Sequence, residues 1–450
     1  MRWLRVTRTG FFGVLAIAAC GFAAFGFVVS WAAAATTAGN TSDYQVETQR
    51  DTGGEAAALA VSSSRVQISN FQGRITLKVA DVGTITMIDP QADHSGEKDY
   101  VTRLRETDDS VTFSVAGRKT LSEDDLQDFY RYQRRNQRQG GNEVLRAYLE
   151  DAPAVTLTVP TGTDIAIDRS IAIVTHEQPG AGTVDAQTLG HVKLGRGVIG
   201  ATLGDLASGN IDVSGIADVT IGDVAGYLNG ALSGSANFRA GALGAARLVL
   251  SGSGNIDTDD IGGHGDLILS GSGNLTVGSV ANSVSRPSQN KSKEMTLLLT
   301  GSGNITANDV GRPVEARISG SGNIDVDNVD GDIRTQISGS GKVHAKTVKG
   351  GVSARISGSG DFDIDRVDGP VNISIGGNGR VRIDGGMAKD LRVSIAGNGH
   401  FTHRGTSTNL DASILGNGSI KVARNEGTLK TSNRDGVIEV NGVRIKPKRR

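Results

Sequence analysis

The stretch Ile318-Ser-Gly-Ser-Gly-Asn-Ile324 recurs along the chain at a nearly constant interval. Further copies begin at Leu250, Leu269, Leu299, Ile337, Ile356, Ile375, Ile395 and Ile414. The first glycines of successive copies are 19 residues apart, except for one step of 30 and one of 20. A fixed period of this length is typical of solenoids, in which each repeat buries its apolar face against its neighbours.

The repeat is too short for helices, because a helical repeat needs two helices and about 33 residues or more. Segments beside the phrase alternate apolar and polar residues, as in Val314-Glu-Ala-Arg-Ile318 and Val371-Asn-Ile-Ser-Ile375, and this alternation predicts β-strands. We therefore predict an all-β fold, a parallel β-helix (β-solenoid) with two or three short strands per coil of about 19 residues. Glycine is expected at the corners because tight bends often require a positive φ.

Residues one period apart would lie directly above one another in such a stack, about 4.8 Å apart. The period predicts two interior columns: Ile318, Ile337, Ile356, Ile375, Ile395, Ile414, and Ile324, Val343, Phe362, Val381, Phe401, Ile420. A third column contains Asn255, Asn274, Asn304 and Asn323. We expect this column to form an amide ladder and favour that structural role over ligand binding.

Composition divides the chain into six segments. These are a signal anchor or signal peptide (1–40), a linker (41–60), an N-terminal β region (61–120), a charged helical insertion (121–152), the solenoid (153–425) and a C-terminal hairpin cap with a basic tail (426–450). Leu232–Phe238 and Ala207–Ile211 are interpreted as degenerate copies of the phrase, and residues 283–293 as a loop that explains the step of 30.

Two further signals lie outside the regular repeats. Ser122 and the acidic residues after it predict the start of a helix. We interpret this insertion as a solvated excursion or a cap, with a nucleic-acid or lipid-headgroup patch as the alternative. Asn441-Gly442 between alternating residues predicts a type I′ hairpin that closes the edge of the last coil.

The N-terminus combines Arg2, Arg5 and Arg8 with an apolar run from Phe11 to Ala35. The run is longer than a usual secretory segment and could span a bilayer, with the rest of the chain outside the cytoplasm. We favour an inner-membrane anchor that faces the periplasm. A cleaved signal peptide, which would give a secreted or cell-surface protein, and a lipoprotein at Cys20 are the alternatives. All three export the chain, which has no other cysteine for a disulfide.

Polar residues on the outside of the predicted strands form two mixed columns. One reads Asp257, Thr276, Thr306, Asp325, His344, Asp363, Arg382, Thr402, Lys421, and the other Asp259, Gly278, Asn308, Asp327, Lys346, Asp365, Asp384, Arg404, Ala423. Acids and bases interleave along them, so we interpret them as a charge-balanced exposed face. A catalytic acid pair at Asp363 with Asp365, or at Asp257 with Asp259, is the alternative.

Other signatures of chemistry are missing from the sequence. His400 and His403 are close, but no third residue completes a metal-ligand spacing, and no catalytic triad or nucleotide-binding motif occurs. Trp3 and Trp31 both lie in the predicted anchor or signal segment 1–40, which weakens the case for sugar recognition by aromatic stacking. The net charge of −1 gives no case for nucleic-acid binding. We therefore assign no catalytic, cofactor-binding or metal-binding residue and expect no cofactor.

The repeated aliphatic-Ser-Gly-Ser-Gly-Asn/Asp-aliphatic phrase resembles that of the putative auto-transporter adhesin head GIN domain family of exported bacterial proteins. The resemblance extends from about Val155 to about Ile420. It implies a right-handed parallel β-helix and an envelope location, and it brings no catalytic residue. The favoured hypothesis is a non-enzymatic exported scaffold or adhesion-like binding module, with an envelope glycan or protein as partner. The alternative is an envelope polysaccharide-active enzyme with acid pairs on one face.

Overall fold

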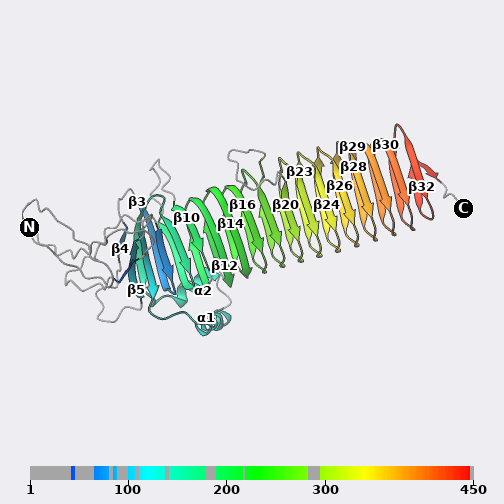
Figure 1. Cartoon of the computed structure of the whole chain (residues 1–450). Helices are drawn as coiled ribbons and strands as arrows, with labels where there is room; N and C mark the ends of the chain where they lie inside the picture. Colours follow the sequence, from blue (N-terminus) through cyan, green and yellow to red (C-terminus); the bar gives the residue numbers. More distant parts are fainter. Residues whose placement is uncertain are drawn as a thin grey trace, which may run out of the picture. The chain divides into compact units, whose positions relative to one another are not determined.

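The computed structural model describes residues 42–45, 65–80, 85–88, 100–106, 111–136, 141–177, 189–195, 197–215, 218–281 and 294–445. The chain divides into two units, Met1–Asn40 and Thr41–Arg450, and all described residues belong to the second. This unit is a β-solenoid of the right-handed type, with about 12 turns of about 19 residues (Figure 1). The predicted anchor, most of the linker, the loop 283–293 and the basic tail lie outside the described residues.

Each coil of the solenoid contributes one strand to each of two parallel ladders. In one coil, β22 (Val314–Ile318) and β23 (Asn323–Val329) are joined by a Ser-Gly-Ser-Gly corner. We call the ladder that contains β22 ladder A and the ladder that contains β23 ladder B. Single bridges such as Val310 to Val329 join successive coils at a third position. The prediction of two or three short strands per coil is therefore confirmed.

Ladder A runs through the whole stack. From one end to the other it contains β1 (Ser42–Gln45), β5 (Tyr100–Glu106), β6 (Val111–Gly117), β2 (Arg65–Ser69), β8 (Asp164–Asp168), β10 (Leu189–Leu194), β12 (Leu206–Gly215), β14 (Val224–Gly234), β16 (Leu243–Leu250), β18 (Gly265–Leu269), β20 (Met295–Leu299), β22, β24 (Ile333–Ile337), β26 (Val352–Ile356), β28 (Val371–Ile375), the ends of β29 (Arg380–Ile395) and β30 (His400–Ile414), and β32 (Leu429–Asn433).

Ladder B runs beside it. It contains β4 (Thr86–Ile88), β7 (Ala154–Pro160), β3 (Gln72–Ala80), β9 (Ser170–Glu177), β11 (Gly197–Thr202), β13 (Asp218–Ile221), β15 (Asn237–Ala240), β17 (Asn255–Thr258), β19 (Asn274–Val277), β21 (Asn304–Ala307), β23, β25 (Lys342–Val348), β27 (Asp361–Val367), the starts of β29 and β30, β31 (Ser419–Asn425), β33 (Val437–Val440) and β34 (Val443–Ile445).

The predicted interior columns form the core between the two ladders. Ile337, Ile356 and Ile375 pair in register in ladder A, and Val343, Phe362 and Val381 do so in ladder B. No member of either column is more than 2% exposed. Side chains along each strand alternate between the core and the outer face as predicted, since Arg355 points outward next to the fully buried Ile356.

The Ser-Gly-Ser-Gly corners need glycine for a reason other than the one predicted. Positive φ angles are found at Gly162, Gly234, Gly386 and Gly442 among the described glycines, and none of these is a glycine of the nine repeat corners. Instead, a Cβ on Gly301 would lie 1.8 Å from the carbonyl oxygen of Gly271 in the preceding coil. The prediction of positive φ was therefore wrong for the nine regular corners, where close stacking of the coils excludes larger residues, although Gly234 in the degenerate copy Leu232–Phe238 does have a positive φ.

The asparagine column forms the expected amide ladder. The Nδ2 group of Asn274 donates to Oδ1 of Asn255 at 3.1 Å, Asn304 donates to Asn274 at 3.2 Å, and Asn323 donates to Asn304 at 3.1 Å. The ladder extends upstream through Asn237, which the degenerate copy Leu232–Phe238 contains. This copy does form a corner, because Leu232 pairs with Leu250 and Phe238 with Ile256.

The other proposed copy, Ala207–Ile211, is not a corner, and that interpretation was wrong. These residues lie within strand β12, where Ile211 pairs with Gly230. The corner of this coil follows β12, since Gly215 pairs with Gly234 and Asp218 with Asn237. The Ser-Gly-Asn sequence at 208–210 resembles the repeated phrase, but it lies inside a strand, whereas the phrase lies at a corner of the coil.

The first strands of the stack are not in sequence order. β2 pairs with β6 on one side and β8 on the other, and β3 lies between β7 and β9. The coil formed by β2 and β3 is thus enclosed by two coils that come later in the chain. Antiparallel pairing of β5 with β6 and of β4 with β7 closes this end of both ladders.

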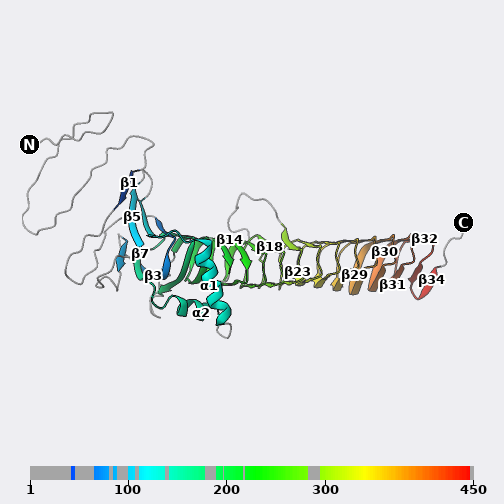
Figure 2. The same ribbon diagram turned by 90° about the horizontal axis from the view of Figure 1, so that it is seen from below.

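The charged insertion contains two helices, α1 (Glu123–Arg135) and α2 (Gly141–Tyr148), which lie beside the N-terminal coils (Figure 2). Ser122 is the N-cap of α1 and forms a capping box with Asp125, which confirms the predicted helix start. Phe129, Leu145 and Leu149 pack against Ile171 and Ile173 of β9. The insertion is therefore attached to the stack by an apolar contact.

The C-terminal end carries the predicted hairpin. Asn441 and Gly442 have φ angles of 54° and 77°, and Val440 pairs with Val443 in an antiparallel arrangement. Ladder B thus ends in an antiparallel strand, as both ladders do at the other end. Among the described residues, no helix is long and apolar enough to cross a bilayer.

Candidate functional site

The mixed charged columns lie on the outer face of ladder B as predicted, and their charges form a network. Asp363 is contacted by Lys342 at 2.8 Å and by Arg382 at 3.3 Å. Arg382 also approaches Asp384 at 3.6 Å, and Arg404 contacts the same carboxylate at 2.8 Å. Ion pairs therefore connect coils along the stack rather than converge on one point.

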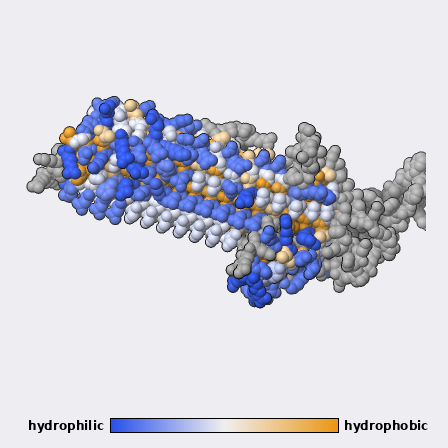
Figure 3. All heavy atoms as spheres, turned by 180° about the vertical axis from the view of Figure 1, so that it is seen from behind, coloured by the Kyte–Doolittle hydropathy of each residue, from blue (hydrophilic) through white to orange (hydrophobic). Residues whose placement is uncertain are grey.

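Three more contacts between acidic and basic side chains continue this pattern. The ring of His344 lies 3.7 Å from Asp325 and 3.3 Å from Asp365, and Lys346 contacts Asp327 at 2.8 Å. His344 thus pairs with Asp365 rather than with Asp363, its neighbour in the predicted column. On the face that Figure 3 shows, the C-terminal coils are covered mostly by hydrophilic residues, in blue.

The structure places Asp363 and Asp365, one of the two proposed acid pairs, in different environments. Asp363 is only 8% exposed and its carboxylate is engaged by two cations, whereas Asp365 is exposed and contacts His344. Asp257 and Asp259 are both exposed on the outer face of the stack. A general acid is usually set apart by burial in a cleft, and neither pair has that arrangement.

The two neighbouring histidines lie on opposite sides of their strand. His400 is exposed, with its Nδ1 2.9 Å from Oγ of Ser419. His403 is 1% exposed, with its Nε2 3.2 Å from the carbonyl oxygen of Thr406, and burial lowers its pKa. Among the described residues, no group of three or more His, Cys, Asp or Glu side chains could hold a metal ion.

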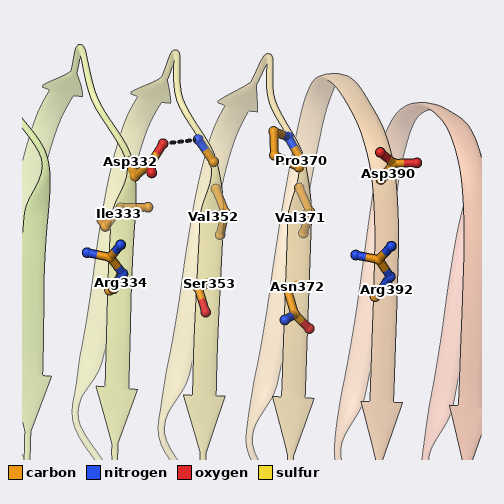
Figure 4. A pocket seen from close by; sticks show the side chains of 11 residues that line it. Asp332, Ile333, Arg334, Val352, Ser353, Pro370, Val371, Asn372, Asp390 and Arg392 are labelled. Atoms are coloured by element: carbon orange, nitrogen blue, oxygen red, sulfur yellow. Dashed lines mark hydrogen bonds between the residues drawn. The ribbon is translucent and has the colours of Figure 1, made fainter.

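The outer face of ladder A carries a shallow groove that the sequence analysis missed. Its volume is about 200 Å³, and its lining includes Arg334, Ser353, Asn372 and Arg392 (Figure 4). Strand register places these four residues in one outward column. Applying the same period to the outward positions of this strand would have revealed the column. We call this depression the ladder A groove.

Acidic residues border the ladder A groove on its two outer strands, with Asp332 before β24 and Asp390 before the ladder A part of β29. Oδ1 of Asp332 accepts a hydrogen bond from the backbone N–H of Gly351 at 2.7 Å, as Figure 4 shows. Oδ1 of Asp390 accepts one from Nδ2 of Asn409 at 3.0 Å. Arg334 pairs with Glu294, and this contact raises the pKa of the guanidinium. Among the described residues, Arg355 and Arg392 have no ion-pair partner.

Fold and surface together define a stacked β-solenoid with extended polar faces and without a convergent polar pocket in its described part. Residues 244–386 match the family described as putative auto-transporter adhesin, head GIN domain. The predicted family resemblance is thus confirmed over these residues, which extend from β16 into β29. That description is adhesin-like and suggests an exported or surface protein. No curated protein and no solved structure matches the chain.

Proposed function

We propose that the protein is a non-enzymatic envelope scaffold or adhesion-like binding module that presents the solenoid outside the cytoplasm. The observation that carries this proposal is the outer face of ladder B, where the candidate acids already have partners: Asp363 pairs with Lys342 and Arg382, and Asp365 contacts the ring of His344. Such a face suits a scaffold whose charges stabilise neighbouring coils. The adhesin-like description of the matched family supports the same class.

The solenoid architecture also explains how the protein would present a binding surface to a partner. Solenoids offer long, regular faces because each coil repeats the outward positions of the last. The apolar run Phe11–Ala35 would hold one end of the chain at the inner membrane, and the solenoid would extend from it to contact an envelope glycan or protein. No nucleic acid is expected as partner.

Two measurements test this proposal. The full-length protein, used as bait in an envelope extract, is expected to retain a glycan or protein partner and to leave polysaccharides uncleaved. A glycan-degradation screen of the wild-type protein beside Asp363→Asn and Asp365→Asn checks the second expectation. Cleavage by the wild-type protein that disappears in either variant would overturn the non-enzymatic assignment.

A further inference from the structure

We propose that the ladder A groove and the strand β28 beneath it bind an acidic polysaccharide, a polymer that combines carboxylates with hydroxyl groups. This inference rests on the proposed function, because it names the ligand class of the binding module. It begins with Arg355 and Arg392, two exposed guanidinium groups that form no ion pair with a described residue, although Asp411 is in register beside Arg392. Both lie on the outer face of ladder A.

The two arginines lie on opposite sides of one strand. β28 is between β26, which carries Arg355, and β29, which carries Arg392. Arg355 is in register with Ser374, and Arg392 is in register with Asn372. Two inter-strand spacings, about 10 Å, separate the flanking strands. Side chains of this length can therefore converge on one anionic group above Asn372 and Ser374.

The residues between the arginines are small and polar. Asn372 and Ser374 are exposed, and Ser353 continues the low floor toward Arg334 (Figure 4). A guanidinium can donate two parallel hydrogen bonds to a carboxylate. The amide of Asn372 and the hydroxyls of the two serines can donate to and accept from sugar hydroxyls. The site thus offers cations for a carboxylate and neutral partners for the rest of a sugar ring.

The acids at the groove select against polymers that are as densely charged as a nucleic acid. Asp332 and Asp390 balance Arg334 and Arg392 among the charged lining residues. A nucleic acid carries a dense row of phosphates, which these two carboxylates would repel. Sugar hydroxyls would instead donate to them. Aromatic side chains are absent from the described lining, so recognition here depends on charge and hydrogen bonds.

Binding of the full-length protein to polygalacturonate tests the proposal, with neutral dextran, dextran sulfate and duplex DNA as comparison polymers. We expect polygalacturonate to bind and the double variant Arg355→Ser/Arg392→Ser to lose about tenfold or more in affinity, because charged hydrogen bonds are removed. Asn372→Leu keeps both cations and should weaken binding less. The matched control is Arg366→Ser/Arg404→Ser, which removes two arginines paired with Asp368 and Asp384 and should bind like the wild-type protein.

Several outcomes would overturn this assignment. Equal binding of DNA or dextran sulfate would mean general polyanion attraction. Equal losses in both double variants, with unchanged thermal melts, would place the ligand elsewhere. In a third outcome, the protein fails to bind polygalacturonate, while the wild-type protein and the Arg355→Ser/Arg392→Ser variant retain the same partner from the envelope extract. That result would reject this site and leave the proposed function standing.

Discussion

At the scale of single residues, the glycines of the corners show how stacking dictates sequence. A Cβ on Gly301 would lie 1.8 Å from the carbonyl oxygen of Gly271, and the backbone has no space to retreat because Ser302 donates to the same carbonyl at 3.1 Å. Gly301→Ala should therefore lower the free energy of unfolding by about 1–3 kcal/mol or more. Chemical denaturation of the purified variant measures this change.

Gly376 provides the matched control, because it lies in an equivalent corner with more space. The nearest atom to a Cβ there is the carbonyl oxygen of Ile356, at 3.9 Å. Gly376→Ala should change stability by less than about 0.5 kcal/mol. Equal losses in the two variants would mean that the corners need glycine for flexibility and that close stacking is not the cause.

His403 introduces a pH dependence into the core of the C-terminal coils. It lies in register between Ile383 and Val422, and its Nδ1 has no hydrogen-bond partner. Burial lowers its pKa from the usual 6.5, so the unfolded chain binds the proton more readily than the folded one. The contribution to stability is complete above pH 6.5 and should be lost as the pH falls below this value.

Unfolding free energies measured from pH 8 to pH 5 in the wild-type protein and in His403→Leu check this expectation. The wild-type protein should lose more stability than the variant over this range, because leucine cannot be protonated. His176, which is also buried with a lowered pKa, remains in both proteins and contributes equally. Parallel curves for the two proteins would show that His403 is protonated without cost.

At the scale of elements, the sequence predicts strands wherever the period is strict and fails where pairing is not periodic. The columns around Ile356 and Phe362 follow directly from the 19-residue step. The position of β3 between β7 and β9 does not, because residues such as Leu77 pair with Leu157 and His176 far along the chain. Local patterns predict that a segment is a strand and do not specify its neighbours in such a sheet.

The ladder A groove was missed for a related reason. Ser353 and Asn372 are ordinary outward residues of alternating strands, and their sequence gives no sign of a site. Only the register shows that they lie between Arg334 and Arg392. The mixed charged columns are easier to recognise in a sequence, and in the structure acids such as Asp363 and Asp384 form ion pairs with neighbouring arginines.

The helical insertion gives a prediction about how one element is attached. Phe129 of α1 is 1% exposed and contacts the ring of Tyr148 edge-on at 5.2 Å between centroids. Phe129→Ala should cost about 3–5 kcal/mol of local stability, since it removes the centre of the contact with β9. Hydrogen exchange at α1 and α2 should then accelerate, while the coils after β20 keep their protection.

Arg134→Ala is the control for this experiment, because Arg134 is an exposed residue of the same helix. Its hydrogen exchange should match that of the wild-type protein. Loss of protection throughout the stack in Phe129→Ala would show that the helices are required for the whole solenoid and are more than a locally attached insertion.

At the scale of the whole molecule, ladder B ends in an antiparallel strand at both ends of the stack. Parallel coils leave an open edge that could accept another strand, and antiparallel strands interrupt this continuation. The side chain of Asn441 secures the C-terminal hairpin, because its Oδ1 accepts from the backbone N–H of Asn425 at 2.7 Å and its Nδ2 donates to the carbonyl of the same residue at 3.1 Å. Ile438 and Val440 cover the last coil of the core.

Removal of this cap should make the protein associate through the exposed end. Deletion of residues 437–450 removes β33 and β34 and uncovers Ile420 and Val422, which are at most 2% exposed in the intact stack. Sedimentation velocity should then show dimers or larger species whose proportion rises with concentration. Deletion of residues 446–450 alone removes four basic side chains and keeps the hairpin, so this control should sediment like the wild-type protein. If the longer deletion sedimented as the control does, the hairpin would not be what keeps this end of the stack from pairing with other chains.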